Sequence, residues 1–415
     1  MRWMKKVVAL LLCIIFLPAS LKAQQDNVPY VMLISFDGFR SDYSKLFGPP
    51  SFQSFAREGA EAEGLIPSFP SKTFPNHYTI VTGLYPGHHG LVDNSFYDPD
   101  RNEYYTMKAR DRVQDPYYYS GTPLWKLAKD NKIRSASFFW VGSELPNEEL
   151  RPDYFYPYDE SIADTLRVDQ VIKWLNLPEI ERPHFITLYF SSPDHEGHAF
   201  GPESTEARNA VMNADRLLSR LTTGVKKTGL PVNMIIVSDH GMLAMKDEPA
   251  TFVFLDEIMD ISKRQVKYSV GGTQAHLYVN TEAQRDSLYN VLKNKAKKFS
   301  IRTNEEFPLH WHYNSVRSGD LLITANPGYY IVEKERPKFE ASRKRGSTFG
   351  AHGYDPLVVP QMRGIFMAQG PNIKSGMKIP AFENIHIYPL IAKILNLPLP
   401  EVDGRFEVLE KIYMK

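Results

Sequence analysis

Three aspartates each follow a short apolar run of the sequence, and three histidines lie in segments that read as loops or short turns. These six residues are Asp37, Asp194, Asp239, His198, His240 and His352. Mixed carboxylate and imidazole ligands suit Zn²⁺, and six such groups are enough to hold two ions. Two ions about 4 Å apart stabilise both the attacking and the leaving oxygen of an in-line displacement at phosphorus. The set therefore predicts a two-zinc centre.

A hydroxyl nucleophile is supplied by the stretch 67–83, which reads as a loop that feeds a helix. Pro75 suits the first helical turn, and Gly83 is a plausible end. Thr73 is thus predicted just ahead of the helix, where unpaired N–H groups favour an anion such as phosphate. The simpler alternative makes Thr73 only a helix N-cap. With metal ligands elsewhere in the chain, a metal ion would activate the Thr73 hydroxyl without a general base.

The elements that must bring these groups together are buried strands. Apolar runs at 30–36, 184–190 and 232–237 precede the three aspartates, and such runs fit strands buried on both faces of a parallel sheet. Ligands gather at the carboxyl ends of strands in such sheets. The amphipathic stretch 206–227 suits a helical crossover between two of them. The sequence therefore predicts an α/β fold with a mostly parallel central sheet flanked by helices.

The remaining chain completes this layout. Further helices are expected at 51–59, 123–129 and 384–395, and further strands at 61–66, 135–141 and 363–368. The proline-bounded aromatic stretch 152–158 reads as a loop that either packs the core or offers a platform for a ring. Residues 242–345 are richer in lysine and less periodic. We expect an inserted cap or auxiliary lobe there, at about 245–345.

The first 23 residues resemble a secretory signal, with Arg2, Lys5 and Lys6 ahead of an apolar run and a small-residue cleavage region ending at Ala23. That run is too short to span a membrane, although an uncleaved anchor is the alternative. Cys13 is the single cysteine and lies inside the segment, so no disulfide is expected in the mature chain. These features predict a periplasmic or secreted protein without an integral membrane span after signal removal.

Size and charge set further limits. The roughly 390 residues that follow the signal exceed the usual limit of one hydrophobic core, so residues 24–415 are expected to form one large domain with an insertion, or two lobes. The formal net charge of +1 argues against a nucleic-acid polymer as a stable partner. A small molecule is the expected substrate. The sequence leaves the oligomeric state open.

As a set, these motifs resemble the nucleotide pyrophosphatase/phosphodiesterase family of the alkaline phosphatase superfamily. The segments that carry the resemblance are Lys72–Tyr78, Asp93-Asn94, Asp194 with His198, Ser238–Gly241 and His352-Gly353, in that order. The resemblance extends from about Tyr30 to Leu397. It implies an alkaline-phosphatase-like core with an inserted cap lobe, and two Zn²⁺ per chain.

The resemblance also implies roles for the metal ligands and the nucleophile. One zinc would be held by Asp194, His198 and His352. The other would be held by Asp37, Asp239 and His240 together with the Thr73 oxygen. Thr73 would be the nucleophile and would form a covalent phospho-threonine intermediate. Asn94 and the backbone N–H of Thr73 would hold a non-bridging phosphate oxygen.

Substrate contacts are implied in the same way. A nucleobase or other apolar group would stack on Phe74, Tyr158 and Tyr189, although Tyr189 has a competing role as a core strand residue. Lys72 either touches phosphate or is solvated. Among the other histidines, His77 is interpreted as a packing or hydrogen-bonded helix residue and His195 as facing away from the metal. Five further histidines are assigned to structure or surface: His184, His276, His310, His312 and His386.

The sequence therefore predicts an exported, two-zinc hydrolase that cleaves nucleotide phosphodiester or pyrophosphate bonds and releases nucleoside monophosphates. A phosphomonoesterase of the same superfamily is the main alternative; it would need cationic contacts, often a Lys and an Arg, to the additional phosphate oxygens. A second, narrower alternative is a phospholipid-headgroup phosphodiesterase, because Tyr158 and Tyr189 would also suit a choline group. A catalytically dead binding protein is disfavoured because all six ligands and Thr73 are present.

Overall fold

A computed structural model describes residues 28–260, 266–333, 335–341 and 346–415. The predicted signal segment, residues 1–23, and its Cys13 lie outside the described residues. Of the helices that the structure describes, none combines the length and the apolar character needed to cross a bilayer.

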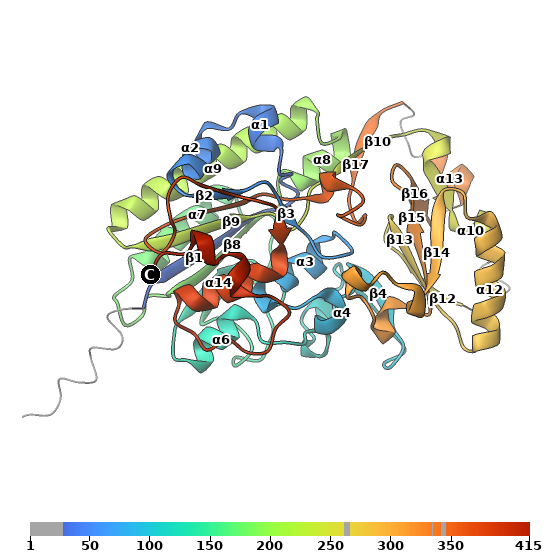
Figure 1. The fold of residues 1–415 in the computed structure, drawn as a ribbon, viewed down its shortest axis with the longest axis horizontal. Helices are drawn as coiled ribbons and strands as arrows, with labels where there is room; N and C mark the ends of the chain where they lie inside the picture. The colour runs from blue at the N-terminus through green and yellow to red at the C-terminus, as the bar shows by residue number, and fades with distance from the viewer. Residues whose placement is uncertain (1–27, 261–265, 334, 342–345) are drawn as a thin grey trace, which may run out of the picture.

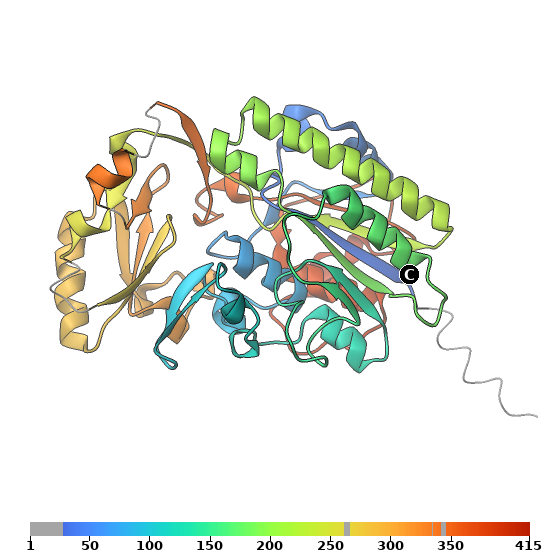
Figure 2. The same cartoon turned by 180° about the vertical axis from the view of Figure 1, so that it is seen from behind.

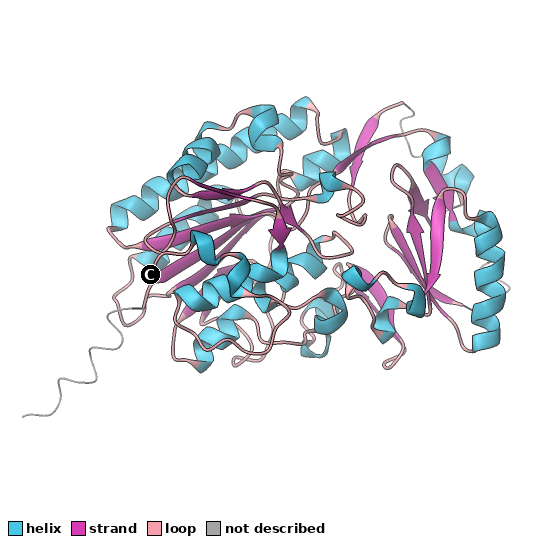
Figure 3. Cartoon of the chain, in the orientation of Figure 1, coloured by secondary structure: helices cyan, strands magenta, loops and turns pink. Residues whose placement is uncertain are grey.

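The central sheet has eight strands among the described residues, in the order β19-β2-β18-β9-β1-β8-β6-β7 (Figures 1 and 3). The strands are β1 Tyr30–Phe36, β2 Ala60–Ala62, β6 Ser135–Phe138, β7 Tyr154–Tyr156, β8 Phe185–Phe190, β9 Val232–Val237, β18 Phe366–Gln369 and β19 Met377–Ile379. β18 runs antiparallel to β9 and β2, and the other neighbouring pairs are parallel. The prediction of a mostly parallel sheet is confirmed.

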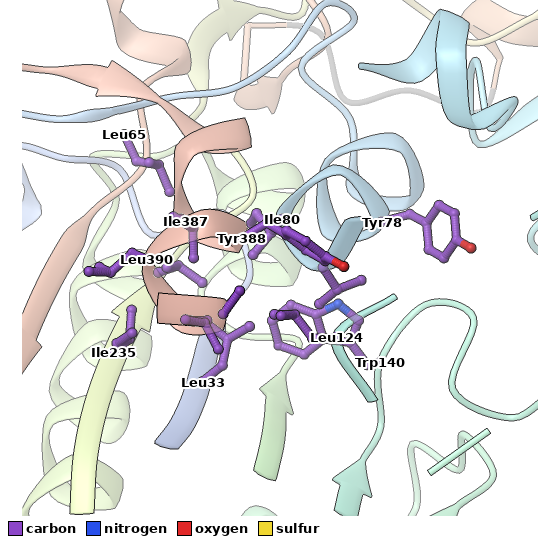
Figure 4. Close-up of a cluster of buried hydrophobic side chains, with 14 of the residues drawn as sticks. Leu33, Leu65, Tyr78, Ile80, Leu124, Trp140, Ile235, Ile387, Tyr388 and Leu390 are labelled. Carbon is purple, nitrogen blue, oxygen red and sulfur yellow. The ribbon is translucent and has the colours of Figure 1, made fainter. Parts of the chain in front are cut away.

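The three central strands β9, β1 and β8 have almost entirely apolar sequences, and they are buried on both faces because helices cover both sides of the sheet. One face packs against α2 Pro50–Glu58, α7 Asp164–Leu175 and α9 Thr205–Thr228. The other packs against α3 Thr73–Thr82, α6 Leu124–Asp130 and α14 Ile387–Ile394. In β1, Met32 faces the first layer. Leu33 faces the second layer, as Figure 4 shows.

The local sequence explains how the long crossover helix begins and ends. The Ser204 side chain caps α9 by accepting a hydrogen bond from the Ala207 N–H. Gly229 follows the helix with φ 70°, the left-handed conformation that favours glycine. α9 thus returns the chain from the end of β8 to the start of β9, as a parallel pairing requires.

Three local predictions differ from the structure. The predicted strand 61–66 is broken into β2 and β3 Leu65–Ile66, because Leu65 leaves the sheet to bridge Gly364 and β3 pairs with β20 Phe382–Glu383. The predicted loop 152–158 contains β7, which adds to the exposed edge of β6 between two prolines. The predicted strand 135–141 ends at Phe138, since Phe139 has a φ of 63°.

A second sheet is formed by residues 267–325, which we call the lobe. Its antiparallel order is β12-β13-β15-β14, with β12 Lys267–Val270, β13 Gln274–Tyr278, β14 Phe299–Thr303 and β15 Leu321–Ala325. α12 Glu282–Lys295 covers its outer side (Figures 1 and 2). The hairpin of β4 Ser95–Asp98 and β5 Glu103–Thr106 lies beside β12. The lobe therefore has an apolar core, which it shares with neighbouring segments, and it contacts the central domain at this hairpin and at the turn between β12 and β13.

Candidate active site

The three aspartates meet because they follow adjacent strands. Asp37 follows β1, Asp239 comes two residues after β9, and Asp194 begins α8 Asp194–Phe200 after β8. The Asp194 N–H donates to the Asp37 carbonyl at 3.0 Å, and the Gly38 N–H donates to Asp239 Oδ1 at 3.3 Å. Gly38 has a φ of 66°, and a Cβ there would lie 2.8 Å from the Asp194 backbone. Only glycine allows this close approach of the two strand ends.

The first candidate metal group consists of Asp194, His198 and His352, whose ligand atoms lie within 4.8 Å of one another. Asp194 and His198 share one face of α8 because they are four residues apart. His198 Nδ1 lies 2.9 Å from the Gly350 carbonyl oxygen and His352 Nδ1 lies 2.8 Å from that of Ser71. Donation from both Nδ1 atoms leaves two Nε2 lone pairs only 3.0 Å apart. A cation between them satisfies both lone pairs.

The second group surrounds His240. Its Nε2 atom lies 3.0 Å from Asp239 Oδ2, 3.6 Å from Asp37 Oδ1 and 3.3 Å from Thr73 Oγ1. Its Nδ1 atom lies 2.9 Å from the Gly241 carbonyl oxygen, so this ring is also fixed with Nε2 toward the carboxylates. The Asp194 carboxylate lies within 4.8 Å of Asp37 and His240 ligand atoms and therefore stands between the two groups.

The electrostatics of the cluster fit cations. Asp37 Oδ1, Asp194 Oδ1 and Asp239 Oδ2 are buried oxygens without a hydrogen-bond partner, which is costly unless something positive faces them. Burial, with Asp239 and Asp194 nearby, raises the pKa of Asp37 well above its ordinary value. Burial and the neighbouring His240 and His198 rings hold the pKa of His352 well below its ordinary value. Carboxylates and neutral imidazoles are the ligand forms that Zn²⁺ takes, so the residues present fit two such ions.

His77 lies against the second group without being free to join it. Its ligand atom lies within 4.8 Å of those of Asp37 and Asp239. Its Nε2 atom, however, contacts Ser35 Oγ at 2.8 Å, and its Nδ1 atom contacts the Thr73 carbonyl oxygen at 3.0 Å. Both nitrogens are occupied, in agreement with the interpretation of His77 as a hydrogen-bonded helix residue.

The nucleophile candidate stands at the first residue of a helix. Thr73 was expected just ahead of the helix, but it is the first residue of α3. The helix includes Thr73 because the Asn76 N–H already donates to the Lys72 carbonyl oxygen. Asn94 Oδ1 accepts a hydrogen bond from the Phe74 N–H at 2.9 Å. With its oxygen engaged in this way, Asn94 has an N–H₂ group available for a phosphate oxygen. The structure thus brings Thr73, His240 and Asn94 together.

Next to Thr73 lies a mainly apolar pocket. Its walls include Phe74, Met107, Trp140, Tyr156, Tyr158 and Tyr189. Tyr158 is 42% exposed and offers its ring to this space. The Tyr189 ring also lines the pocket, while its hydroxyl donates to Asp37 Oδ2 at 2.7 Å. Tyr189 therefore contacts Asp37 through its hydroxyl and also presents its ring to the pocket. All three predicted stacking residues border the pocket, and stacking itself stays a prediction.

Two charged residues of the pocket were missed from sequence. Arg110 and Glu144 line it and form a two-pronged ion pair, with both N–O distances 2.7 Å. Glu144 also accepts a hydrogen bond from the Tyr158 N–H. Residues 140–144 read as a strand end, but nothing in the sequence showed that Arg110 returns to it.

Lys72 is buried beside the site. Its ammonium pairs with Asp93 Oδ1 at 3.1 Å and donates to the Gly271 carbonyl of the lobe, and the residue is 3% exposed. The alternative that Lys72 is solvated is wrong, because the lobe covers it. A direct contact of Lys72 with phosphate stays a prediction.

Sequence comparison identifies the family of this chain. A family model described as type I phosphodiesterase / nucleotide pyrophosphatase matches residues 31–355. The chain belongs to this family. Its members are named for hydrolysis of phosphodiester and pyrophosphate bonds, and the expected resemblance is confirmed.

One relative of this phosphodiesterase is an uncharacterized pyrophosphatase/phosphodiesterase of Schizosaccharomyces pombe. The two sequences are 34% identical over 392 residues, and the match covers 91% of this chain and 79% of that protein. Human ectonucleotide pyrophosphatase/phosphodiesterase family member 1 is 34% identical over 90% of this chain. The chain spans only 41% of the length of that human relative.

A solved structure with a similar fold is that of murine ectonucleotide pyrophosphatase/phosphodiesterase 5, in an inactive form with a threonine replaced by alanine, in complex with AMP. The TM-score is 0.84 at 28% identity, covering 93% of this chain and 100% of the murine chain. The phosphodiesterase fold predicted from sequence is thereby confirmed.

Proposed function

We propose that this chain is an exported two-zinc phosphodiesterase/pyrophosphatase that releases nucleoside monophosphates from nucleotide phosphodiester or pyrophosphate bonds. The observation that carries the proposal is the position of Thr73 Oγ1, 3.3 Å from His240 Nε2 at a helix N-terminus and on the wall of an aromatic pocket. The inactive threonine-to-alanine form of the murine neighbour, in complex with AMP, supports the same assignment.

Residues that would hold the ions are Asp194, His198 and His352 for one, and Asp37, Asp239, His240 and the Thr73 oxygen for the other. When bound, zinc supplies Lewis-acid stabilisation of charge on the reacting oxygens. Thr73 Oγ1 forms a bond to phosphorus as the bond to the leaving oxygen breaks. Asn94 N–H₂ holds a non-bridging oxygen. Water then cleaves the phospho-threonine and frees the nucleoside monophosphate.

The main alternative, a phosphomonoesterase, needs cations for the additional unesterified oxygens. The two cations that the structure places at this site, Lys72 and Arg110, are already paired with Asp93 and Glu144. The side of the pocket toward the substituent is apolar instead. This arrangement favours a diester substrate.

A headgroup phosphodiesterase for choline is the second alternative. A quaternary ammonium seeks aromatic faces and unpaired carboxylates. Here Glu144 is neutralised by the Arg110 guanidinium, whose side chain is 47% exposed at the pocket. Because the Glu144 carboxylate is already paired, it does not attract a cationic group, and the apolar and aromatic pocket wall suits a nucleobase better.

The test is a rate comparison on the purified protein, with p-nitrophenyl thymidine monophosphate, p-nitrophenyl phosphate and p-nitrophenyl phosphorylcholine. We expect the thymidine diester to be preferred, with kcat/KM at least about tenfold above either competitor, a difference of about 1.4 kcal/mol. Preference for the monoester would replace the proposal by the phosphatase alternative. Preference for the choline ester would replace it by the headgroup alternative.

Tyr158→Ala is expected to lower kcat/KM for the thymidine diester by roughly 5- to 160-fold, because base stacking contributes about 1–3 kcal/mol. The loss should be much smaller for methyl p-nitrophenyl phosphate, which has no base. Tyr158→Phe is the matched control, since it keeps the ring and should keep the rate. Equal losses on both substrates would count against stacking.

We also propose that residues 24–415 act as one catalytic domain with an inserted cap region at about 245–345 that contains the lobe, and that residues 1–23 direct export. The lobe core formed by β12 to β15 and α12 supports the first point. The human relative's name, which marks it as an ectoenzyme, supports the second.

A further inference from the structure

Three buried side chains form a connected group behind the candidate active site. Lys72 Nζ lies 3.1 Å from Asp93 Oδ1, and His276 Nε2 lies 3.2 Å from Asp93 Oδ2. Their exposed fractions are 3%, 0% and 0% for Lys72, Asp93 and His276. His276 was assigned to structure or surface from sequence, and its contact with Asp93 spans 183 positions of the chain.

The imidazole of His276 is fixed at both ends. Nδ1 lies 3.1 Å from the Ser318 carbonyl oxygen, so both ring nitrogens face oxygen acceptors. Although burial alone raises the pKa of Asp93, Lys72 and His276 hold it below its ordinary value. The Asp93 carboxylate is thus held in one orientation, because Lys72 contacts one of its oxygens and His276 contacts the other.

This locked carboxylate lies next to both phosphate-contacting segments. Lys72 precedes Thr73, and Asp93 precedes Asn94. Asp93 Oδ1 also accepts the Asn94 backbone N–H at 2.6 Å. In return, Asn94 Oδ1 accepts the Phe74 N–H at 2.9 Å. The segments 72–74 and 93–94 are therefore cross-linked twice, and His276 of the lobe braces the cross-link from behind.

The same β12–β13 hairpin touches a third segment of the site. Thr273 Oγ1 donates to the His352 carbonyl oxygen at 3.0 Å, and the Gln274 amide donates to the Gly353 carbonyl oxygen. At Gly271 the fit is so close that a Cβ would meet Lys72 Nζ. One hairpin of the lobe thus contacts the segments of the nucleophile, of Asn94 and of a predicted metal ligand.

We propose that His276 is a positioning residue for the phosphodiesterase reaction: through Asp93 and Lys72 it fixes Thr73 and Asn94 at the separation that in-line attack requires. The inference rests on the proposed function for the reaction it serves. A buried charge group is a weak source of stability, because desolvation offsets most of the attraction. Correct placement of the reacting groups is a better explanation for this buried group than stability is. Small misplacements of reacting groups slow a reaction about 100-fold.

The test uses His276→Gln in the full-length protein, with His184→Gln as the matched control. His184 Nδ1 also contacts a backbone carbonyl oxygen, that of Val28 at 2.9 Å. His184 lies at the start of β8, whereas the candidate active site lies beyond the end of that strand. We expect kcat for p-nitrophenyl thymidine monophosphate to fall by at least roughly tenfold in His276→Gln, with KM and zinc content unchanged. In double variants, the loss of activity from His276→Gln should not add to that from Asn94→Ala, because both act on the same group of contacts. It should add to the loss from Tyr158→Ala, which acts at a separate part of the site.

A second readout does not depend on turnover. Hydrogen exchange of peptides that cover 68–78 and 91–96 should be faster in His276→Gln than in the wild type, and unchanged in His184→Gln. If the wild type has no diesterase activity, the proposed function fails, and exchange still decides whether His276 braces these segments. Unchanged kcat with unchanged exchange overturns the inference, as does a loss confined to thermal stability. Should the Gln variant not fold, His276→Phe keeps the ring volume and takes its place.

Discussion

Thr73→Ala is expected to abolish turnover, lowering kcat by roughly 10⁵-fold or more, as loss of a nucleophile does in covalent catalysis. In the proposed mechanism the Thr73 hydroxyl forms the bond to phosphorus, and alanine has no group that could replace it. The variant should fold and keep its zinc, because Asp37, Asp239 and His240 remain. The measurements are single-turnover hydrolysis of the thymidine diester, far-UV circular dichroism and metal analysis.

The control for this variant lies on the same helix. Thr82→Ala removes a buried hydroxyl that donates to the Tyr78 carbonyl at 2.7 Å, one helix length from the site. It should lose some stability and keep its kcat. A Thr73→Ala protein that turns over at the wild-type rate would remove Thr73 from the mechanism altogether.

Removal of metal has the second large expected effect. Chelation should eliminate diesterase activity and lower the thermal midpoint, because three buried carboxylate oxygens then face one another without a counter-charge. Readdition of Zn²⁺ should restore both. His198→Ala should retain about one zinc per chain where the wild type retains about two, since it removes a ligand of the first group only. Activity, differential scanning calorimetry and metal content measure the three effects.

His195→Ala is the matched variant for the metal prediction. His195 is the exposed neighbour of Asp194 on α8, and it belongs to neither ligand group. It should keep both ions and the wild-type rate. Full activity in the presence of a strong chelator, or equal metal content in the His198 and His195 variants, would contradict the two-zinc assignment.

Much of the fold could be predicted because its information is local. The apolar runs that end at Phe36, Phe190 and Val237 fix three buried strands, and a parallel sheet brings their carboxyl ends together. The spacing of Asp194 and His198 places both on one helix face. These rules locate the carboxylates without any knowledge of side-chain packing.

What the sequence did not reveal depends on contacts between distant segments. Arg110 meets Glu144 and His276 meets Asp93 only after the chain has folded, and neither pair has a periodic signature. Lys72 looked free for phosphate or water because the hairpin that covers it lies 199 residues away. β7 escaped prediction because three residues between prolines form a strand only when β6 offers an open edge.

The place of the lobe in the chain has a consequence for biosynthesis. Asp37, Asp239 and His240 precede the lobe in the chain and are synthesised before it, whereas His352 and β18 follow it. A nascent chain that has reached Gly241 holds every proposed protein ligand of one group and only two of the other. It also lacks the strand that closes the sheet on that side of β9. The candidate site therefore reaches its complete set of proposed ligands only when synthesis has passed the lobe and added His352.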